Sequence, residues 1–419
     1  MTKRIIHEHE SNVASYNRAF PFVIQSAKGS LITDDDGKEY IDFFSGAGAN
    51  NYGHNPEAPK QALLRYIQSD GINNSLDMAT TAKTEFIDAF YEIILKPRNY
   101  DYRLQFTGPT GTNAVEAALK LVRKNTSRKG IVSFTRGFHG VSLGSLAATS
   151  NTYFREAAGV ELHDVSFIDY DSGELADSLA KLEHQFADII QGDGLPAGVI
   201  VETTQGEGGV NSARPEWLQT LRSLTEQHGV LLIIDDIQAG CGRSGDFFSF
   251  EKAGIVPDVV TLSKSISGYG SPMSLVLIRP EYDVWRPAEH NGTFRGNNHA
   301  FVTAKAALEE YWKTDQLAVS VEHKAAIIRS ALEKMASEHP KLGLYVKGRG
   351  FLQGISFANP STAADVGKTA FAHGLIVERA GTEDEVVKLM PALTIDEATL
   401  LKGLDILAAS ITQVAATAN

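Results

Sequence analysis

The sequence has a single cysteine, Cys241, among its 419 residues. One cysteine excludes an intrachain disulfide and a zinc site built from several thiolates. The histidines do not cluster at ligand spacing, so no metal site is expected. Apolar runs of the ~20 residues that span a bilayer are also missing, and the start, "MTKRIIHEHE", has no apolar run of signal-peptide length. We therefore expect a cytoplasmic protein that neither crosses a membrane nor holds a metal.

Positive charge is scarce as well. Lysine and arginine number 39 against 51 aspartates and glutamates, which gives a formal net charge of −12. Nucleic acids and anionic membranes attract proteins with an excess of positive charge, so neither is an expected partner.

What the chain does have is an alternation of short apolar runs with amphipathic segments. Strands are expected at 103–106, 130–134, 197–202, 230–236 and 258–262, and helices at 113–125 and 215–229. Nearly continuous apolar runs of this length are typical of strands buried on both faces, which predicts an α/β fold with a mostly parallel sheet and helices on both faces.

The two ends of the chain have a different pattern. Residues 29–44 resemble a hairpin, and long helices follow residue 300, the last one near 396–414. We expect a large domain at 60–300, with 1–59 and 301–419 forming a smaller α+β lobe beside it.

Ligands of an open parallel sheet bind at the C-terminal ends of its strands, so the residues that follow each strand are the candidates. After 103–106, Gly108 and Gly111 allow close backbone approach, and Thr112 lies at a helix start, where free amides attract an anion. A nucleotide-binding P-loop would need a lysine after Gly111, and there is none. A plain capped turn is the alternative.

Other strand ends carry an aromatic ring and carboxylates. Phe138 and His139 follow 130–134, and Glu202 and Glu207 bracket a glycine-containing loop. Asp235 ends the apolar run 230–236, where a buried carboxylate requires a partner. Each of these also has an ordinary explanation, as a core aromatic or a capping carboxylate.

Lys264 follows the last strand of this set, among small residues in "SKSISGYG". Lysine in a cleft can serve as a nucleophile or base, although most single lysines do neither. An anion site, an aromatic face, a deep carboxylate and a lysine are together what pyridoxal 5'-phosphate requires. A nicotinamide cofactor fits less well, because no Gly-x-Gly-x-x-Gly follows the first strand.

Longer motifs resemble one family. "IIDDIQAGCGRSGDFFSFEKAGIVPDVVTLSKSISGYGSP", together with "YIDFFSGAGANNYGHN", "GPTGTNAVEAALK", "FHG", "QGEGG" and "NGTFRGNN", is similar to the ordered motifs of the class III pyridoxal-phosphate aminotransferases, of fold type I. The resemblance extends over essentially the whole chain.

The resemblance implies roles for individual residues. Lys264 would form the Schiff base with the cofactor and shuttle protons, and Asp235 would keep the pyridine nitrogen protonated. The other residues assigned to the cofactor are Gly111, Thr112, Phe138, His139, Gln238 and Thr293. Thr293 would reach the phosphate of a neighbouring subunit, which implies a homodimer or a dimer of dimers.

On the substrate side, Glu207 matches a glutamate that gates the site between two substrates. Related enzymes carry an arginine where this chain has Lys388, and lysine lacks the bidentate fork of arginine. Arg295 could supply the guanidinium, or it could be a surface arginine at the dimer seam. Tyr52, in "NYGHN", is assigned to the same group.

Within the class, the motifs resemble most the members that transfer an amino group from L-glutamate to L-aspartate 4-semialdehyde. The products are L-2,4-diaminobutyrate and 2-oxoglutarate, and the pathway is ectoine biosynthesis. Another ω-amine of the 4-aminobutyrate, ornithine or acetylornithine type, or of a specialised pathway, is the alternative. A relative that has lost catalysis would be expected to lack Lys264, Asp235 or Gln238, and all three are present.

Overall fold

A seven-stranded sheet forms the centre of the computed structural model, which describes residues 2–417. Its order is β4 (Arg103–Phe106), β10 (Leu275–Ile278), β9 (Val259–Leu262), β8 (Leu231–Asp235), β7 (Gly198–Val201), β5 (Ile131–Phe134) and β6 (Val165–Ile168). Only β10 runs antiparallel to its neighbours. The mostly parallel sheet and the five expected strands are confirmed, within one or two residues at each end. β6 and β10 were not expected.

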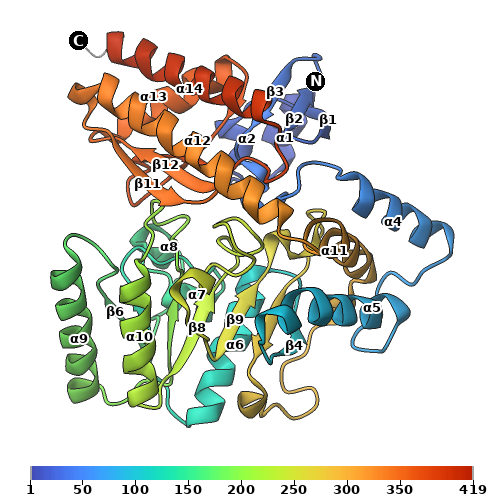
Figure 1. Ribbon diagram of the computed structural model, residues 1–419, viewed down its shortest axis with the longest axis vertical. Coiled ribbons are helices and arrows are strands. Elements are labelled where there is room, and N and C mark those ends of the chain that lie inside the picture. Colours follow the sequence, from blue (N-terminus) through green and yellow to red (C-terminus); the bar gives the residue numbers. More distant parts are fainter. Residues whose placement is uncertain (1, 418–419) are drawn as a thin grey trace.

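Helices cover both faces of this sheet (Figure 1). Helix α6 (Gly111–Thr126) packs on one face against Ile200 and Ile233. On the other face, Val199 and Leu232 pack with α9 (Leu175–Gly192) and α10 (Pro215–Gln227). Consecutive residues of a strand point to opposite faces of the sheet. Strands in which apolar and polar residues do not alternate are therefore buried on both faces.

Further helices surround the sheet. They are α4 (Glu57–Gln68), α5 (Thr81–Phe90), α7 (Leu143–Ala148), α8 (Thr152–Glu156) and α11 (Asn298–Tyr311), and α11 packs on α4 and α5. The expected domain boundaries, near residues 60 and 300, fall inside α4 and α11. The division into domains therefore stays a prediction.

The smaller lobe contains two four-stranded sheets and is seen at the top of Figure 1. One has the order β1 (Ile24–Lys28), β2 (Leu31–Asp34), β3 (Glu39–Asp42) and β13 (Leu375–Ile376). The other has the order β11 (Tyr345–Arg349), β12 (Leu352–Ser356), β15 (Val386–Leu389) and β14 (Glu378–Ala380). The hairpin expected at 29–44 is β2–β3, and β3 pairs with β13, so the two ends of the chain share one sheet.

Helices α12 (Gln316–Glu338), α13 (Pro360–Ala372) and α14 (Glu397–Thr417) pack around these sheets, and the short helices α1 (Thr2–His9), α2 (Tyr16–Ala19) and α3 (Ser45–Gly48) belong to the N-terminal segment. Within residues 2–417, α14 alone has the length and mean hydropathy of a membrane span. It is interrupted by Glu397, Lys402 and Asp405, and it packs on α12 and α13. The apolar face of α14 is therefore accounted for by packing inside this lobe.

Candidate active site

Lys264 emerges at the end of β9, as the first residue of a short 3-10 helix, Lys264–Ser267. Its φ of +49° lies in the left-handed region, which is uncommon for a residue with a side chain and marks a strained position. Burial lowers the pKa of Lys264, and the charge of Lys388 adds to this, although Glu207 opposes it. A lowered pKa increases the neutral fraction of the amine, which is the form that attacks a carbonyl.

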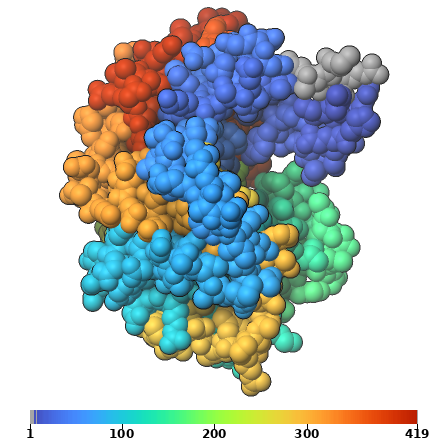
Figure 2. All heavy atoms as spheres, turned by 90° about the vertical axis from the view of Figure 1, so that its right-hand side faces the viewer, coloured from blue at the N-terminus to red at the C-terminus, as the bar shows by residue number. Residues whose placement is uncertain are grey.

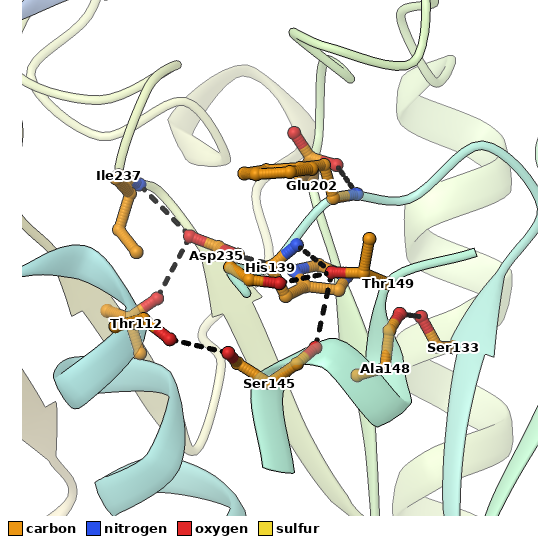
Figure 3. A network of polar contacts seen from close by, with 12 residues as sticks. Thr112, Ser133, His139, Ser145, Ala148, Thr149, Glu202, Asp235 and Ile237 are labelled. Atoms are coloured by element: carbon orange, nitrogen blue, oxygen red, sulfur yellow. Dashed lines mark hydrogen bonds and ion pairs between the residues drawn. The ribbon is translucent and has the colours of Figure 1, made fainter. Parts of the chain in front are cut away.

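Asp235 ends β8, the strand beside β9, and lies in register with Thr261. Its Oδ1 accepts hydrogen bonds from the Thr261 hydroxyl at 3.1 Å and from the Ile237 amide at 3.2 Å. His139 Nδ1 lies 2.7 Å from Oδ2, and both side chains are buried (Figure 3). Because β8 and β9 are adjacent and parallel, Asp235 and Lys264 emerge at the same edge of the sheet.

Two further groups set the charge around this carboxylate. Burial lowers the pKa of His139, but its hydrogen bond to Asp235 and the Asp235 charge outweigh that effect and raise it. Burial raises the pKa of Glu202 to about 7, with its carboxylate accepting from the amides of Phe138 and Gly206. Asp235 therefore favours the protonated form of His139, and burial favours the protonated form of Glu202.

A group of hydroxyls surrounds the start of α6. Thr110 caps this helix by accepting from the Asn113 amide, and a helix start leaves its first amides without intrahelical acceptors. The Thr112 hydroxyl lies 2.5 Å from the hydroxyls of Ser142 and Ser145. Figure 3 shows Thr112 and Ser145 below Asp235 in the same network. Sequence reasoning had missed the two serines, although Ser-x-x-Ser at a helix start is a recognisable capping signal.

Position 111, at the start of α6, has little room for a side chain. A Cβ at position 111 would approach Ile237 Cδ1 to 3.1 Å, and Ile237 is two residues beyond Asp235. The anion-attracting helix start and the deep carboxylate are thus brought against one another by packing.

Glu207, Gln238 and Lys388 form a second cluster, and the charges of Glu207 and Lys388 act on the pKa of Lys264. Lys388 Nζ lies 2.9 Å from Glu207 Oε1, and Gln238 Nε2 donates to the same oxygen at 3.4 Å. The Lys388 side chain is completely buried. The charge of Lys388 lowers the pKa of Glu207 despite the opposing effect of burial, and the pKa of Lys388 is raised in turn, because its carboxylate neighbours outweigh burial.

Two members of this cluster had not been expected. Glu378 Oε2 lies 2.8 Å from Lys388 Nζ, and the Tyr16 hydroxyl donates to Glu378 Oε1 at 2.7 Å. Glu378 and Lys388 face each other in the register of β14 and β15. The available signal for Glu378 was a carboxylate directly after the apolar residues "LIV" of a strand-like run.

The remaining predicted residues lie in different surroundings. The Phe138 ring contacts the ring of Phe154 edge-on, 5.5 Å between centroids, and lines a cavity together with Glu207. Thr293 is exposed on the single chain. Arg295 pairs with Asp77 at 2.5 Å.

Tyr52 is buried, accepts a hydrogen bond from Trp312 Nε1 at 2.8 Å and stacks on Tyr311. Among the contacts of residues 2–417, no hydrogen bond or ion pair joins Tyr52 or Arg295 to Lys264, Glu207 or Lys388.

Arg243, the arginine of the "GCGR" motif, makes structural hydrogen bonds to distant segments of the chain. It is fully buried and donates to Asn51 Oδ1 and to the carbonyls of Phe351 and Pro391. Burial lowers its pKa to about 9. Arg243 therefore joins the large domain to both ends of the chain.

The site fits a phosphorylated, planar aldehyde. Its donor set combines a helix start with hydroxyls for an anion, a buried carboxylate, an aromatic ring and a lysine whose pKa is lowered. Gln238 Oε1 is buried without a hydrogen-bond partner among the described residues, so the amide has capacity left for another polar group.

Comparison with known proteins agrees with this geometry. The family model "Aminotransferase class-III" matches residues 13–411. Diaminobutyrate–2-oxoglutarate transaminase of Bordetella parapertussis is 54% identical over 414 residues, 98% of this chain and 95% of that protein. The enzyme of the same name from Halalkalibacterium halodurans is 54% identical over 97% of this chain and 96% of its own length. The chain belongs to the class III aminotransferases, and it is an aminotransferase.

Among solved structures, the ornithine aminotransferase of Toxoplasma gondii superposes with a TM-score of 0.85 at 25% identity, over 98% of this chain and 93% of that one. Its description places pyridoxal phosphate at its active site. The predicted fold class is thereby confirmed, and the family implies the same cofactor for this chain.

Proposed function

We propose that the protein transfers an amino group from L-glutamate to the C4 aldehyde of L-aspartate 4-semialdehyde. The products are L-2,4-diaminobutyrate and 2-oxoglutarate. The observation that carries the catalytic part is the emergence of Lys264 and of the Asp235–His139 pair at neighbouring parallel strand ends. The names of the relatives at 54% identity support this substrate.

Pyridoxal 5'-phosphate, when bound, supplies an electron sink for the carbon that gains or loses the amino group. Lys264 holds its aldehyde carbon and moves the proton at that carbon. Asp235, made rigid by His139 and Thr261, holds a proton on the pyridine nitrogen. Gly111 and Thr112 bind the phosphate, Phe138 covers the ring, and Gln238 donates to the ring oxygen.

Thr293 reaches the phosphate site of a neighbouring subunit, so the active form is a homodimer or a dimer of dimers. Its exposure on the single chain supports that role. We also propose the cytoplasm as its location, and residues 60–300 as the cofactor domain between the end segments 1–59 and 301–419.

On the substrate side, Glu207 and Lys388 form the gate. In the closed state they bind one another at 2.9 Å, and a substrate carboxylate displaces Glu207 in the glutamate half-reaction. Arg295 and Tyr52 remain candidates for substrate contacts that involve the second subunit.

The test uses the purified protein with pyridoxal phosphate. We expect a yellow protein whose cofactor becomes fixed to Lys264 by borohydride, and loss of fixation in Lys264→Ala. A panel of aldehydes with glutamate as donor should then favour aspartate semialdehyde. Equal or better rates with succinate semialdehyde or glutamate semialdehyde would instead assign an ω-amine of the 4-aminobutyrate or ornithine type.

A further inference from the structure

A cavity of about 490 Å³ opens beside Phe138 and Glu207. Residues of the α7–α8 region line it, among them Phe154 and Arg155, and Arg136 and Arg379 line it as well. Figure 2 shows that the molecule is hollowed between the N-terminal segment, in dark blue, and the green segment that contains residues near 150. The cavity is therefore lined by Phe138 and has charges of both signs on its wall.

The negative charge belongs to Glu207. Lys388 and Gln238 both bind its Oε1, and no hydrogen bond or ion pair within residues 2–417 uses Oε2. Glu207 is also the accessible member of its cluster: its side chain is 30% exposed, against 7% for Glu378 and 0% for Lys388. Oε2 of Glu207 therefore lies on the most exposed residue of the cluster formed by Glu207, Glu378 and Lys388.

Glu378 competes with Glu207 for the ammonium of Lys388. Both carboxylates contact Lys388 Nζ, at 2.8 Å for Glu378 and 2.9 Å for Glu207, so a single ammonium serves the two of them. Glu378 cannot leave, because the register of β14 and β15 and the Tyr16 hydroxyl hold it against Lys388. Glu207 lies on a loop with its carboxylate partly exposed at the cavity, which favours an ammonium ligand.

Arg155, one of three arginines on this wall, is held in a fixed orientation. Its Nη1 donates to the carbonyls of Leu146, Ala147 and Thr149 at 2.8 to 3.1 Å, and the guanidinium lies 5.1 Å from the centre of the Phe167 ring. None of the ion pairs of the described chain involves Arg155, whereas Arg379 pairs with Asp384 at 3.3 Å. Arg155 is thus a pre-oriented guanidinium with donors left for a carboxylate.

We propose that this cavity binds the zwitterionic end of a small α-amino acid, with the α-ammonium at Glu207 and the α-carboxylate at Arg155. Glu378 is the positioning residue that keeps Glu207 available. The inference rests on the proposed ω-transamination and deepens it. The substrate would be an α-amino acid whose reacting amine or aldehyde lies at the opposite end of its side chain. Glu207 would then bind its α-ammonium and Arg155 its α-carboxylate.

Three amines dissect this recognition. L-2,4-diaminobutyrate carries both groups, 4-aminobutyrate lacks the α-ammonium, and 1,3-diaminopropane lacks the α-carboxylate. The amine half-reaction of each is followed in single turnovers through the absorbance of the bound cofactor. We expect L-2,4-diaminobutyrate to react with the highest second-order rate constant.

Variants should shift this preference selectively. Arg155→Gln should lower the rate constant about tenfold for the two carboxylates but not for 1,3-diaminopropane. Glu207→Gln should lower it about tenfold for the two diamines but not for 4-aminobutyrate, and Glu378→Gln should act in the same direction with a smaller change. Arg379→Gln and Asp384→Asn, a cavity-lining pair already satisfied by each other, are the matched controls.

Arg155 also caps α7, so Arg155→Lys serves as the conservative variant, and it should restore part of the carboxylate preference. Calorimetric binding of L-2-aminobutyrate, which keeps the head group without the ω-amine, should weaken in Arg155→Gln and Glu207→Gln. Equal losses for all three amines, or unchanged preference, would overturn the inference.

Failure of the proposed function has a separate signature. If L-2,4-diaminobutyrate fails to convert the cofactor in the unaltered protein while glutamate does, the proposed substrate is wrong. If it converts the cofactor and the variants leave the preference unchanged, only the assignment of Glu207 and Arg155 is wrong.

Discussion

The imidazole Nδ1 of His139 lies 2.7 Å from Oδ2 of Asp235, and each side chain is buried. The second carboxylate oxygen is held by Thr261 and by the Ile237 amide. Asp235 is thus fixed in orientation by contacts from three different segments of the chain.

Asp235→Asn should therefore reduce kcat by about a hundredfold or more, because an amide cannot hold the cofactor nitrogen protonated. Asp236→Asn is the matched control, since Asp236 is equally buried but accepts a hydrogen bond from the Ser249 amide, which an amide oxygen also accepts. Steady-state rates with glutamate measure both. Similar losses in the two variants would contradict the special role of Asp235.

Stability should depend on pH through Glu202. Its pKa is about 7 in the folded protein against an ordinary 4.5, because burial disfavours the charged form. Between these values the folded state binds more protons than the unfolded state, so the contribution of Glu202 is complete below pH 4.5 and is lost as pH rises through 7.

The free energy of unfolding of Glu202→Gln should accordingly decline less between pH 5 and 8, by at most about 3 kcal/mol. Denaturant titrations at several pH values measure this. Burial also raises the pKa of Asp236 to about 7, so part of the decline in unfolding free energy should remain in Glu202→Gln. Adding Asp236→Asn should reduce that remaining decline. An identical pH dependence in Glu202→Gln and the unaltered protein would rule out this source.

Arg243→Met should destabilise the fold by about 3 kcal/mol or more. The change leaves Asn51 Oδ1 and the carbonyls of Phe351 and Pro391 buried without their donor. Arg18→Met, at an exposed arginine whose side chain bonds to Asn12 alone among the described residues, should change stability by less than about 1 kcal/mol. Urea unfolding compares the two.

Lys388→Met should cost about 3 to 5 kcal/mol, because Glu207 and Glu378 would lose their shared counterion inside the protein. The double variant Lys388→Met with Glu378→Gln should recover part of this loss, since one buried carboxylate is then neutral. Strict additivity of the two single changes in unfolding experiments would show that Glu378 and Lys388 are not coupled.

Local pattern was enough to predict the large sheet and the strand ends that carry Lys264 and Asp235. Continuous apolar runs mark strands buried on both faces, and a parallel sheet places the residues that follow them at one edge. Local pattern also predicted the hairpin at β2–β3 and the helices after residue 300. β10 was not predicted as a strand, and its antiparallel direction could not have been, because an apolar run carries no information about strand direction.

The chain order therefore determined which residues reach the edge of the sheet, and its motifs determined the family. Only the tertiary structure decided their partners. Glu378 meets Lys388 through strand register, Tyr16 joins them from 362 positions away, and His139 reaches Asp235 across 96. Contacts of that sequence separation depend on how distant segments of the chain pack against one another, and no local periodicity encodes them.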